Sequence, residues 1–142
     1  MHPGIGVGRL TPELDVTDLA TSIAFYGLLG FHVAYERADE GFAYLASSGA
    51  ALMLQVASGP GRRFRTAPLE RPFGRGVNLQ LELDDVDTVY RKIIDAGHEI
   101  VVALGERWYR VEAQQAGNRQ FVVADPDGYL VRPFASLGTR HE

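Results

Sequence analysis

One sequence pattern occurs twice in this chain, and it limits the possible folds more than any other feature. Residues 14–18 read Leu-Asp-Val-Thr-Asp, and residues 81–85 read Leu-Glu-Leu-Asp-Asp. In each copy the last Asp stands twelve positions before a glycine, Gly30 or Gly97. An alternating strand, an Asp that can cap a helix and a glycine that can end it therefore recur together. Such a repeat predicts two copies of one structural unit.

The expected elements follow one order in both copies. In the first copy, alternation and helical spacing predict strands at 9–17, 31–36, 42–46 and 50–56 and a helix from 18 to 30. In the second copy they predict strands at 76–83, 99–104, 119–124 and 129–134 and a helix from 85 to 97. Each copy is thus a βαβββ module, with a longer hairpin in the second. The Gly-rich residues 1–8 are expected to form a flexible arm, and the tail after Ala135 is expected to be loose.

Composition narrows the class of protein. The 142 residues suit one compact domain or two small modules that share a core. Since the chain has no cysteine, it forms no disulfide, no thiolate metal site and no cysteine nucleophile. A net charge of -4 argues against nucleic-acid binding. No apolar run approaches the roughly 18 residues that span a bilayer, and no signal-peptide pattern is visible. These features predict a cytoplasmic protein with neither a nucleic-acid nor a membrane partner.

A segment without periodicity joins the two modules. We expect a single domain over residues 1–142, with module one at about 9–57, a linker at 58–75 and module two at about 76–135. The linker region contains five arginines and two phenylalanines: Arg62, Arg63, Arg65, Arg71, Arg75, Phe64 and Phe73. It can be interpreted as a solvated linker, or as a flap that closes on a ligand with aromatic and guanidinium groups.

Side chains that are polar, with one methionine among them, gather on the strand faces that must point away from the two helices. They are Thr11, Glu13, Asp15, Met53, Gln55, Asn78, Gln80 and Glu82. A half-buried sheet commonly turns such a face to solvent. The repeat supports an alternative in which two sheets curl together and these faces line one cleft. Glu13 would then correspond to Gln80, and Asp15 to Glu82.

Several motifs resemble one protein family. They are Phe25-Tyr26 and Leu29-Gly30-Phe31 on the first helix, Asp84-Asp85-Val86-Asp87 at the second, and Arg119-Gln120-Phe121 followed by Asp125-Pro126-Asp127-Gly128. Together they resemble the vicinal oxygen chelate superfamily, which includes glyoxalase I, extradiol dioxygenases and bleomycin resistance proteins. The resemblance covers about residues 9–135. It implies an α+β fold in which two tandem βαβββ modules form a curled mixed sheet around a cleft.

The resemblance also points to where a metal would be bound. Metal-dependent members carry His seven residues before each helix cap and Glu after the Asp-Pro-Asp-Gly turn. The matching positions here are Thr11, Asn78 and Arg132, and a further carboxylate position falls at Met53. None of these side chains is a good ligand for a divalent first-row metal. We therefore expect no metal, no cofactor and no catalytic residue, although Glu13 with Glu82 remains an unorthodox alternative for an ion.

Without the metal ligands, the pattern is most similar to bleomycin resistance proteins, which sequester a drug without modifying it. The resemblance implies a homodimer and an aromatic-lined site for a small aromatic or cationic ligand. The candidate ligand-binding residues are Trp108, Tyr109, Arg132, Glu13, Asn78, Gln80, Glu82, Met53, Tyr44 and Phe64. For Trp108 and Tyr109 the alternative is rim packing or a dimer contact. Two other functions stay open, namely a divergent metal-dependent lyase or dioxygenase with relocated ligands, and a regulatory domain without a small ligand.

Overall fold

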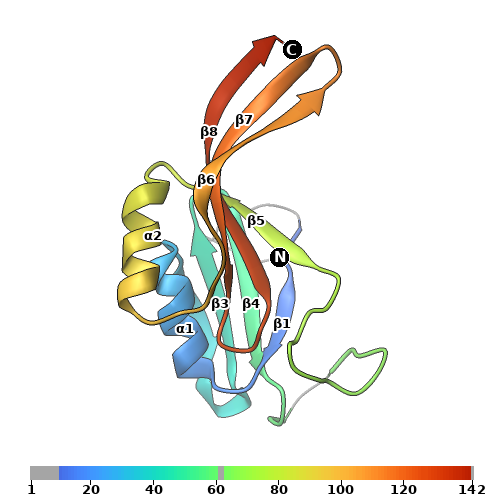
Figure 1. The fold of residues 1–142 in the computed structure, drawn as a ribbon. Helices are drawn as coiled ribbons and strands as arrows, with labels where there is room; N and C mark the ends of the chain where they lie inside the picture. Colours follow the sequence, from blue (N-terminus) through green and yellow to red (C-terminus); the bar gives the residue numbers. More distant parts are fainter. Residues whose placement is uncertain (1–9, 61–62, 142) are drawn as a thin grey trace. The chain divides into compact units, whose positions relative to one another are not determined.

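The computed structural model describes residues 10–60 and 63–141. The chain divides into two compact units, Met1–Glu70 and Arg71–Glu142. Each unit contains one four-stranded sheet and one α-helix (Figure 1). The predicted Gly-rich arm lies outside the described residues. Within the described ranges, neither helix has the length and apolar content needed to cross a bilayer.

The first unit is a mixed sheet with the strand order β1-β4-β3-β2. β1 runs parallel to β4, and the other neighbours are antiparallel. Its elements are β1 (Glu13–Val16), α1 (Leu19–Leu28), β2 (His32–Arg37), the short 3-10 helix η1 (Ala38–Glu40), β3 (Phe42–Ser47) and β4 (Ala50–Val56).

The second unit repeats this topology, with the strand order β5-β8-β7-β6 and a parallel β5–β8 pair. Its elements are β5 (Asn78–Glu82), α2 (Val86–Asp95), β6 (Ile100–Val111), β7 (Gln114–Ala124) and β8 (Leu130–His141). The prediction of two tandem βαβββ modules is therefore confirmed.

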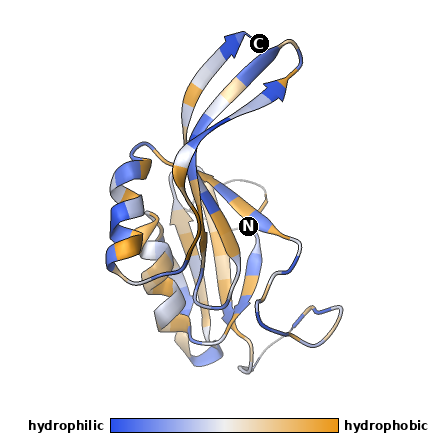
Figure 2. Ribbon diagram, in the orientation of Figure 1, coloured by the Kyte–Doolittle hydropathy of each residue, from blue (hydrophilic) through white to orange (hydrophobic). Residues whose placement is uncertain are grey.

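The strands of the second unit extend further than predicted. β6 continues through residues 105–111, and the tail expected to be loose is the second half of β8. Register pairs such as Gln114↔His141 and Trp108↔Gly117 join the three strands to their ends. The sequence did not reveal this because most side chains there are exposed, so no buried face imposes an alternating pattern. Figure 2 shows hydrophilic and hydrophobic residues mixed along these strand ends. In the first unit the prediction is too long instead of too short, since β1 covers only Glu13–Val16 of the predicted strand 9–17.

Both helices begin and end where the repeat predicted. The Asp18 carboxylate accepts a hydrogen bond from the Thr21 backbone N–H at 3.0 Å, and Asp85 accepts one from Thr88 at 3.1 Å. The Thr21 N–H stabilises the charged Asp18 carboxylate and holds its pKa below the ordinary value. The pKa of Asp85 is lowered first by the Thr88 hydroxyl, which donates to Oδ2 at 2.7 Å, and then by the Thr88 N–H. The glycines after the helices have positive φ, 100° at Gly30 and 83° at Gly97.

Each sheet buries one face against its own helix. In the first unit Val16, Phe25, Leu45 and Leu54 are fully or almost fully buried. In the second unit the same is true of Val86, Ile93, Phe121, Val123 and Val131. Because successive strand residues point to opposite sides, the residues between these core positions form the face that each sheet turns away from its helix. The candidate site residues on β1, β4, β5 and β8 lie on that face.

A tight turn precedes β8. The Asp125 carboxylate accepts hydrogen bonds from the backbone N–H groups of Asp127 and Tyr129, each at 2.9 Å. Gly128 adopts a φ of 101°, and the Phe73 N–H donates to the Asp127 carbonyl at 2.9 Å. The buried Asp127 carboxylate accepts a bond from Arg71 Nη2 at 2.7 Å. The turn is thus bound to the first residues of the second unit.

Candidate ligand-binding site

The face of the first sheet that points away from α1 is polar at its β1–β4 edge and aromatic at β3, the next strand. In the strand register Glu13 lies beside Met53, which lies beside Tyr44. One row further, Asp15 lies beside Gln55. Neighbouring strands therefore bring two carboxylates and an amide together at the β1–β4 edge.

A cavity of about 190 Å³ opens at this edge. It is lined by Glu13, Asp15, Gln55, Arg63 and Phe64. The Gln55 side chain is only 8% exposed, whereas Phe64 is 76% exposed. The cavity therefore combines a buried polar wall with an aromatic ring that faces solvent.

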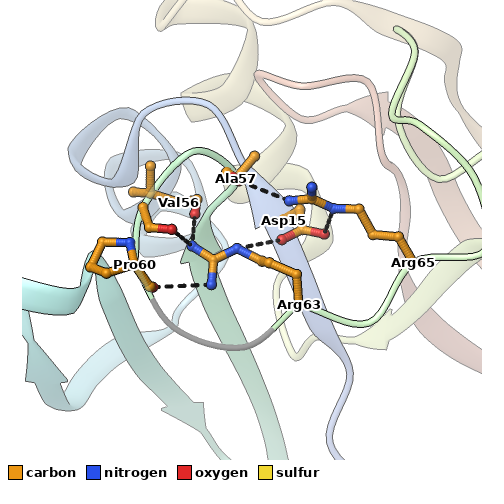
Figure 3. A network of polar contacts seen from close by, with 7 residues as sticks. Asp15, Val56, Ala57, Pro60, Arg63 and Arg65 are labelled. Carbon is orange, nitrogen blue, oxygen red and sulfur yellow. Dashed lines mark hydrogen bonds and ion pairs between the residues drawn. The ribbon is translucent and has the colours of Figure 1, made fainter.

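Two arginines of the segment between the modules reach back to β1 (Figure 3). Arg65 Nε lies 3.0 Å from Asp15 Oδ2, and Arg63 Nε lies 3.7 Å from Asp15 Oδ1. Their remaining N–H groups donate to backbone carbonyls: Arg65 to Ala57 at 2.9 Å, and Arg63 to Val56, to Gly59 at 2.9 Å and to Pro60 at 3.2 Å. Arg63 and Arg65 are thus bound to the sheet edge, and the solvated-linker interpretation is wrong for both.

Gln55 connects this network to Glu13. The hydrogen-bond network assigns the amide oxygen to Arg63 Nη1 at 2.6 Å and the amide nitrogen to Glu13 Oε2 at 3.3 Å. Asp15 therefore faces two guanidinium groups, while Glu13 faces a neutral amide. Because both guanidinium groups lie against Asp15 and Glu13 faces an amide, Glu13 is the lining position at which a ligand cation gains most.

Tyr44 and Met53 belong to an aromatic cluster on the same face. Tyr44 is 1% exposed and packs with Phe42 and Ala51, and Tyr35 and Met53 pack against this group. The Tyr35 and Tyr44 rings stack with centroids 5.2 Å apart. In the described structure, the Tyr44 ring therefore contacts its neighbours rather than solvent.

On the second sheet, three candidate residues of β5 are exposed and one of them has a partner on β8. Arg132 Nη2 donates to Gln80 Oε1 at 3.0 Å, as expected for paired positions on parallel neighbours. Asn78 and Glu82 are exposed on either side of Gln80. The repeat correspondence between Glu13 and Gln80 thus places a carboxylate in one unit and a neutral amide in the other.

Trp108 and Tyr109 point to opposite sides of β6, as successive strand residues must. The Trp108 ring covers Gly117, where a Cβ atom would come within 2.7 Å of the ring, and the Arg140 guanidinium lies 4.0 Å from the ring centroid. Tyr109 lies on the other side, where its hydroxyl accepts a hydrogen bond from Gln120 Nε2 at 2.6 Å. Tyr109 therefore shares a face with Gln120, and Trp108 does not.

Sequence reasoning missed three residues of these networks. The sequence shows Arg63 and Arg65 only as part of an arginine-rich segment, because nothing local connects them to Asp15. Gln120 stands out only as part of the Arg119-Gln120-Phe121 motif. Its signal was available, since it precedes the core residue Phe121 on a strand and must therefore point to the polar face.

The residues at the positions of the family's metal ligands do not fit a metal. Thr11 and Asn78 offer neutral oxygens, Met53 packs with Tyr44, and Arg132 carries a cation that is bonded to Gln80. Among residues 10–60 and 63–141, no three His, Asp or Glu side chains are grouped to hold an ion. The donor set is therefore unsuited to a divalent first-row cation.

Comparisons with known proteins agree with the repeat and the topology. The profile of the glyoxalase/bleomycin resistance protein/dioxygenase superfamily matches residues 8–132. A bleomycin resistance protein from Klebsiella pneumoniae is 30% identical over 124 residues, which are 87% of this chain and 89% of that protein.

Solved structures share the fold. A bleomycin-binding protein in complex with bleomycin is 25% identical, with a TM-score of 0.57, over 91% of this chain and 98% of that one. TioX from Micromonospora sp. ML1 is 20% identical, with a TM-score of 0.67, over 95% of this chain and 99% of that one. The chain therefore belongs to the glyoxalase/bleomycin resistance protein/dioxygenase superfamily.

Proposed function

We propose that this protein is a metal-independent binding protein of the bleomycin-resistance type, which sequesters an aromatic or cationic small molecule. The observation that carries the proposal is the cavity at the β1–β4 edge, where Glu13 lies across a buried amide from an arginine-paired Asp15. The curated relative that is 30% identical is a bleomycin resistance protein, which supports this class of ligand.

The cavity suits a planar cation for two reasons. The carboxylate of Glu13 supplies the charge, and a charge-assisted hydrogen bond to it is stronger than a neutral one. The exposed ring of Phe64 supplies a flat apolar surface at which an aromatic or cationic group can stack. Asp15 has a different role in this proposal, because its bonds to Arg63 and Arg65 hold the segment that presents Phe64.

The proposal includes the polar residues of the second unit and a second copy of the chain. Further polar contacts on the face opposite α2 are offered by Asn78, Gln80, Glu82, Arg132 and Tyr109. Trp108 offers an aromatic surface on the other face of the same sheet. Tyr44 and Met53 flank the polar edge of the first sheet on the same face. We propose that the protein acts as a cytoplasmic homodimer, without a nucleic-acid or membrane partner.

Trp108 gives a direct test of the aromatic part of the proposal. Replacing Trp108 with Ala is expected to weaken bleomycin binding about two- to tenfold, because one aromatic stacking contact contributes about 0.5–1.5 kcal/mol beyond buried area. The melting temperature is expected to change little, since Trp108 packs on Gly117 rather than in the helix-covered core. Equilibrium titration and thermal unfolding of the same preparations measure both quantities.

Arg140→Gln is the matched control, because it removes the guanidinium over the Trp108 ring and leaves the ring in place. This variant is expected to bind bleomycin at least as tightly as the parent chain. A loss of stability equal to the loss of affinity in Trp108→Ala would show that Trp108 has a structural role only.

A further inference from the structure

Gln120 is a buried polar residue that the proposed first-unit cavity does not use. It lies on β7, on the face that points away from α2, and it is 8% exposed. Its Nε2 donates to the Tyr109 hydroxyl at 2.6 Å. Its Oε1, in contrast, is a buried acceptor that receives no hydrogen bond from the described residues. A buried polar atom without a partner is uncommon and costs free energy.

Arg132 on β8 presents the complementary atom. Its Nη2 donates to Gln80, but its Nε is a buried donor without a hydrogen-bond partner among the described residues. Gln120 is paired with Phe134, so Arg132, two positions earlier on β8, is its diagonal neighbour on the same face. Diagonal neighbours on antiparallel strands have Cα atoms about 7–8 Å apart, within reach of long side chains.

An acceptor and a donor thus stand side by side on one sheet face, and each lacks a partner among the described residues. A primary carboxamide matches them, since its N–H can donate to Gln120 Oε1 while its carbonyl accepts from Arg132 Nε. A carboxylate offers no donor to Gln120, and Glu82, in the same cross-strand row as Gln120, disfavours a second anion. An amidinium offers no acceptor to Arg132 and adds a like charge beside it.

We infer that Gln120 and Arg132 form a subsite for the carboxamide group of a ligand, distinct from the cation-binding cavity of the first unit. Gln80 orients the guanidinium through its bond to Nη2, and because the Gln120 amide nitrogen donates to the Tyr109 hydroxyl, the amide oxygen is the atom left without a partner among the described residues. Tyr109 is itself 39% exposed, so the face beside Gln120 is partly open to solvent.

Three fragments of nearly equal shape test the assignment: benzamide, benzoate and benzamidine. Each is titrated into the full chain, uniformly labelled with ¹⁵N, and followed by NMR. Benzamide is expected to shift the side-chain amide resonance of Gln120, and to bind about tenfold more tightly than benzoate, because benzoate cannot donate a hydrogen bond to Gln120 and would leave its buried oxygen unpaired. Benzoate that binds as tightly as benzamide at Gln120 would overturn the assignment, and so would the absence of any shift with benzamide.

Two variants locate the effect. Gln120→Leu and Arg132→Met are each expected to weaken benzamide binding at least fivefold, since each removes one partner and keeps most of the side-chain volume. Gln120→Leu is not expected to lower the melting temperature, because it replaces an unsatisfied buried amide with an apolar group. Unchanged benzamide binding in either variant would contradict the subsite.

Glu13→Gln separates this inference from the proposed function. It alters the first-unit cavity and is expected to leave benzamide binding unchanged. Conversely, Gln120→Leu is expected to leave the binding of benzamidine at Glu13 unchanged. Loss of benzamide binding in Glu13→Gln would show that the fragment occupies the first-unit cavity, and the subsite would be wrong.

Discussion

Replacing Glu13 with Gln is expected to weaken the binding of a cationic ligand about ten- to a hundredfold. A hydrogen bond to a charged group contributes about 1.5–3 kcal/mol, and the substitution removes the charge but keeps the shape of the side chain. Asp15 cannot replace it, because its two oxygens already face Arg63 and Arg65. The cavity would then retain one carboxylate and one guanidinium, and its lining would have no net charge. Titration with metal-free bleomycin and with benzamidine measures the loss.

Salt dependence and a matched variant make this prediction specific. Rising ionic strength is expected to weaken cation binding by the parent chain, and to weaken it less in Glu13→Gln, since a charge–charge attraction is screened and a neutral contact is not. Glu36→Gln is the control, because Glu36 is an exposed glutamate on β2 outside the cavity. If Glu36→Gln weakens binding as much as Glu13→Gln, the effect is due to overall charge, and the assignment of Glu13 is wrong.

Gly128→Ala is expected to destabilise the protein by about 3 kcal/mol or more, a large part of the 5–15 kcal/mol typical of a folded protein. Gly128 has a φ of 101°, a conformation that is strained for Ala. In addition, the new Cβ would lie 2.5 Å from Pro72 Cβ and 2.8 Å from Pro72 Cα. The second atom belongs to the backbone, so relief requires movement of the whole segment. Chemical denaturation measures the change in the free energy of unfolding.

Gly138→Ala is the matched control for this prediction. Gly138 also has a positive φ, 86°, but a Cβ there would meet no atom within 4 Å. The Gly138→Ala variant should therefore lose only the part of the free energy of unfolding that comes from backbone conformation, about 1–2 kcal/mol. Equal losses at the two positions would mean that backbone conformation alone decides the cost and that the contact between the turn and Pro72 contributes nothing.

The parts of the fold that could be predicted depend on local patterns. The repeat at residues 14–18 and 81–85 identified both strand–helix junctions, and Asp18 and Asp85 cap the helices as expected. Alternation identified β4 to the residue, Ala50–Val56, because Leu52, Leu54 and Val56 alternate with Met53 and Gln55 in the sequence. Local rules succeed at these positions because burial or a cap hydrogen bond acts within a few residues.

The parts that could not be predicted depend on contacts between distant residues. Arg65 binds Asp15, fifty positions earlier, and no pattern around either residue indicates this pairing. The outer half of the β6–β8 ribbon is held by strand pairing rather than by burial, so its side chains carry no periodic signal. The separation of Trp108 from Tyr109 follows from strand geometry, but only once residues 105–111 are known to be a strand.

Isothermal titration calorimetry with metal-free bleomycin tests the central claim most directly. The protein is first dialysed against a chelator, and its metal content is measured by elemental analysis. We predict saturable binding at no more than one bleomycin per chain, without bound metal and with the drug recovered unmodified. The absence of binding, or binding that requires a stoichiometric divalent ion and converts the ligand, would contradict the proposal.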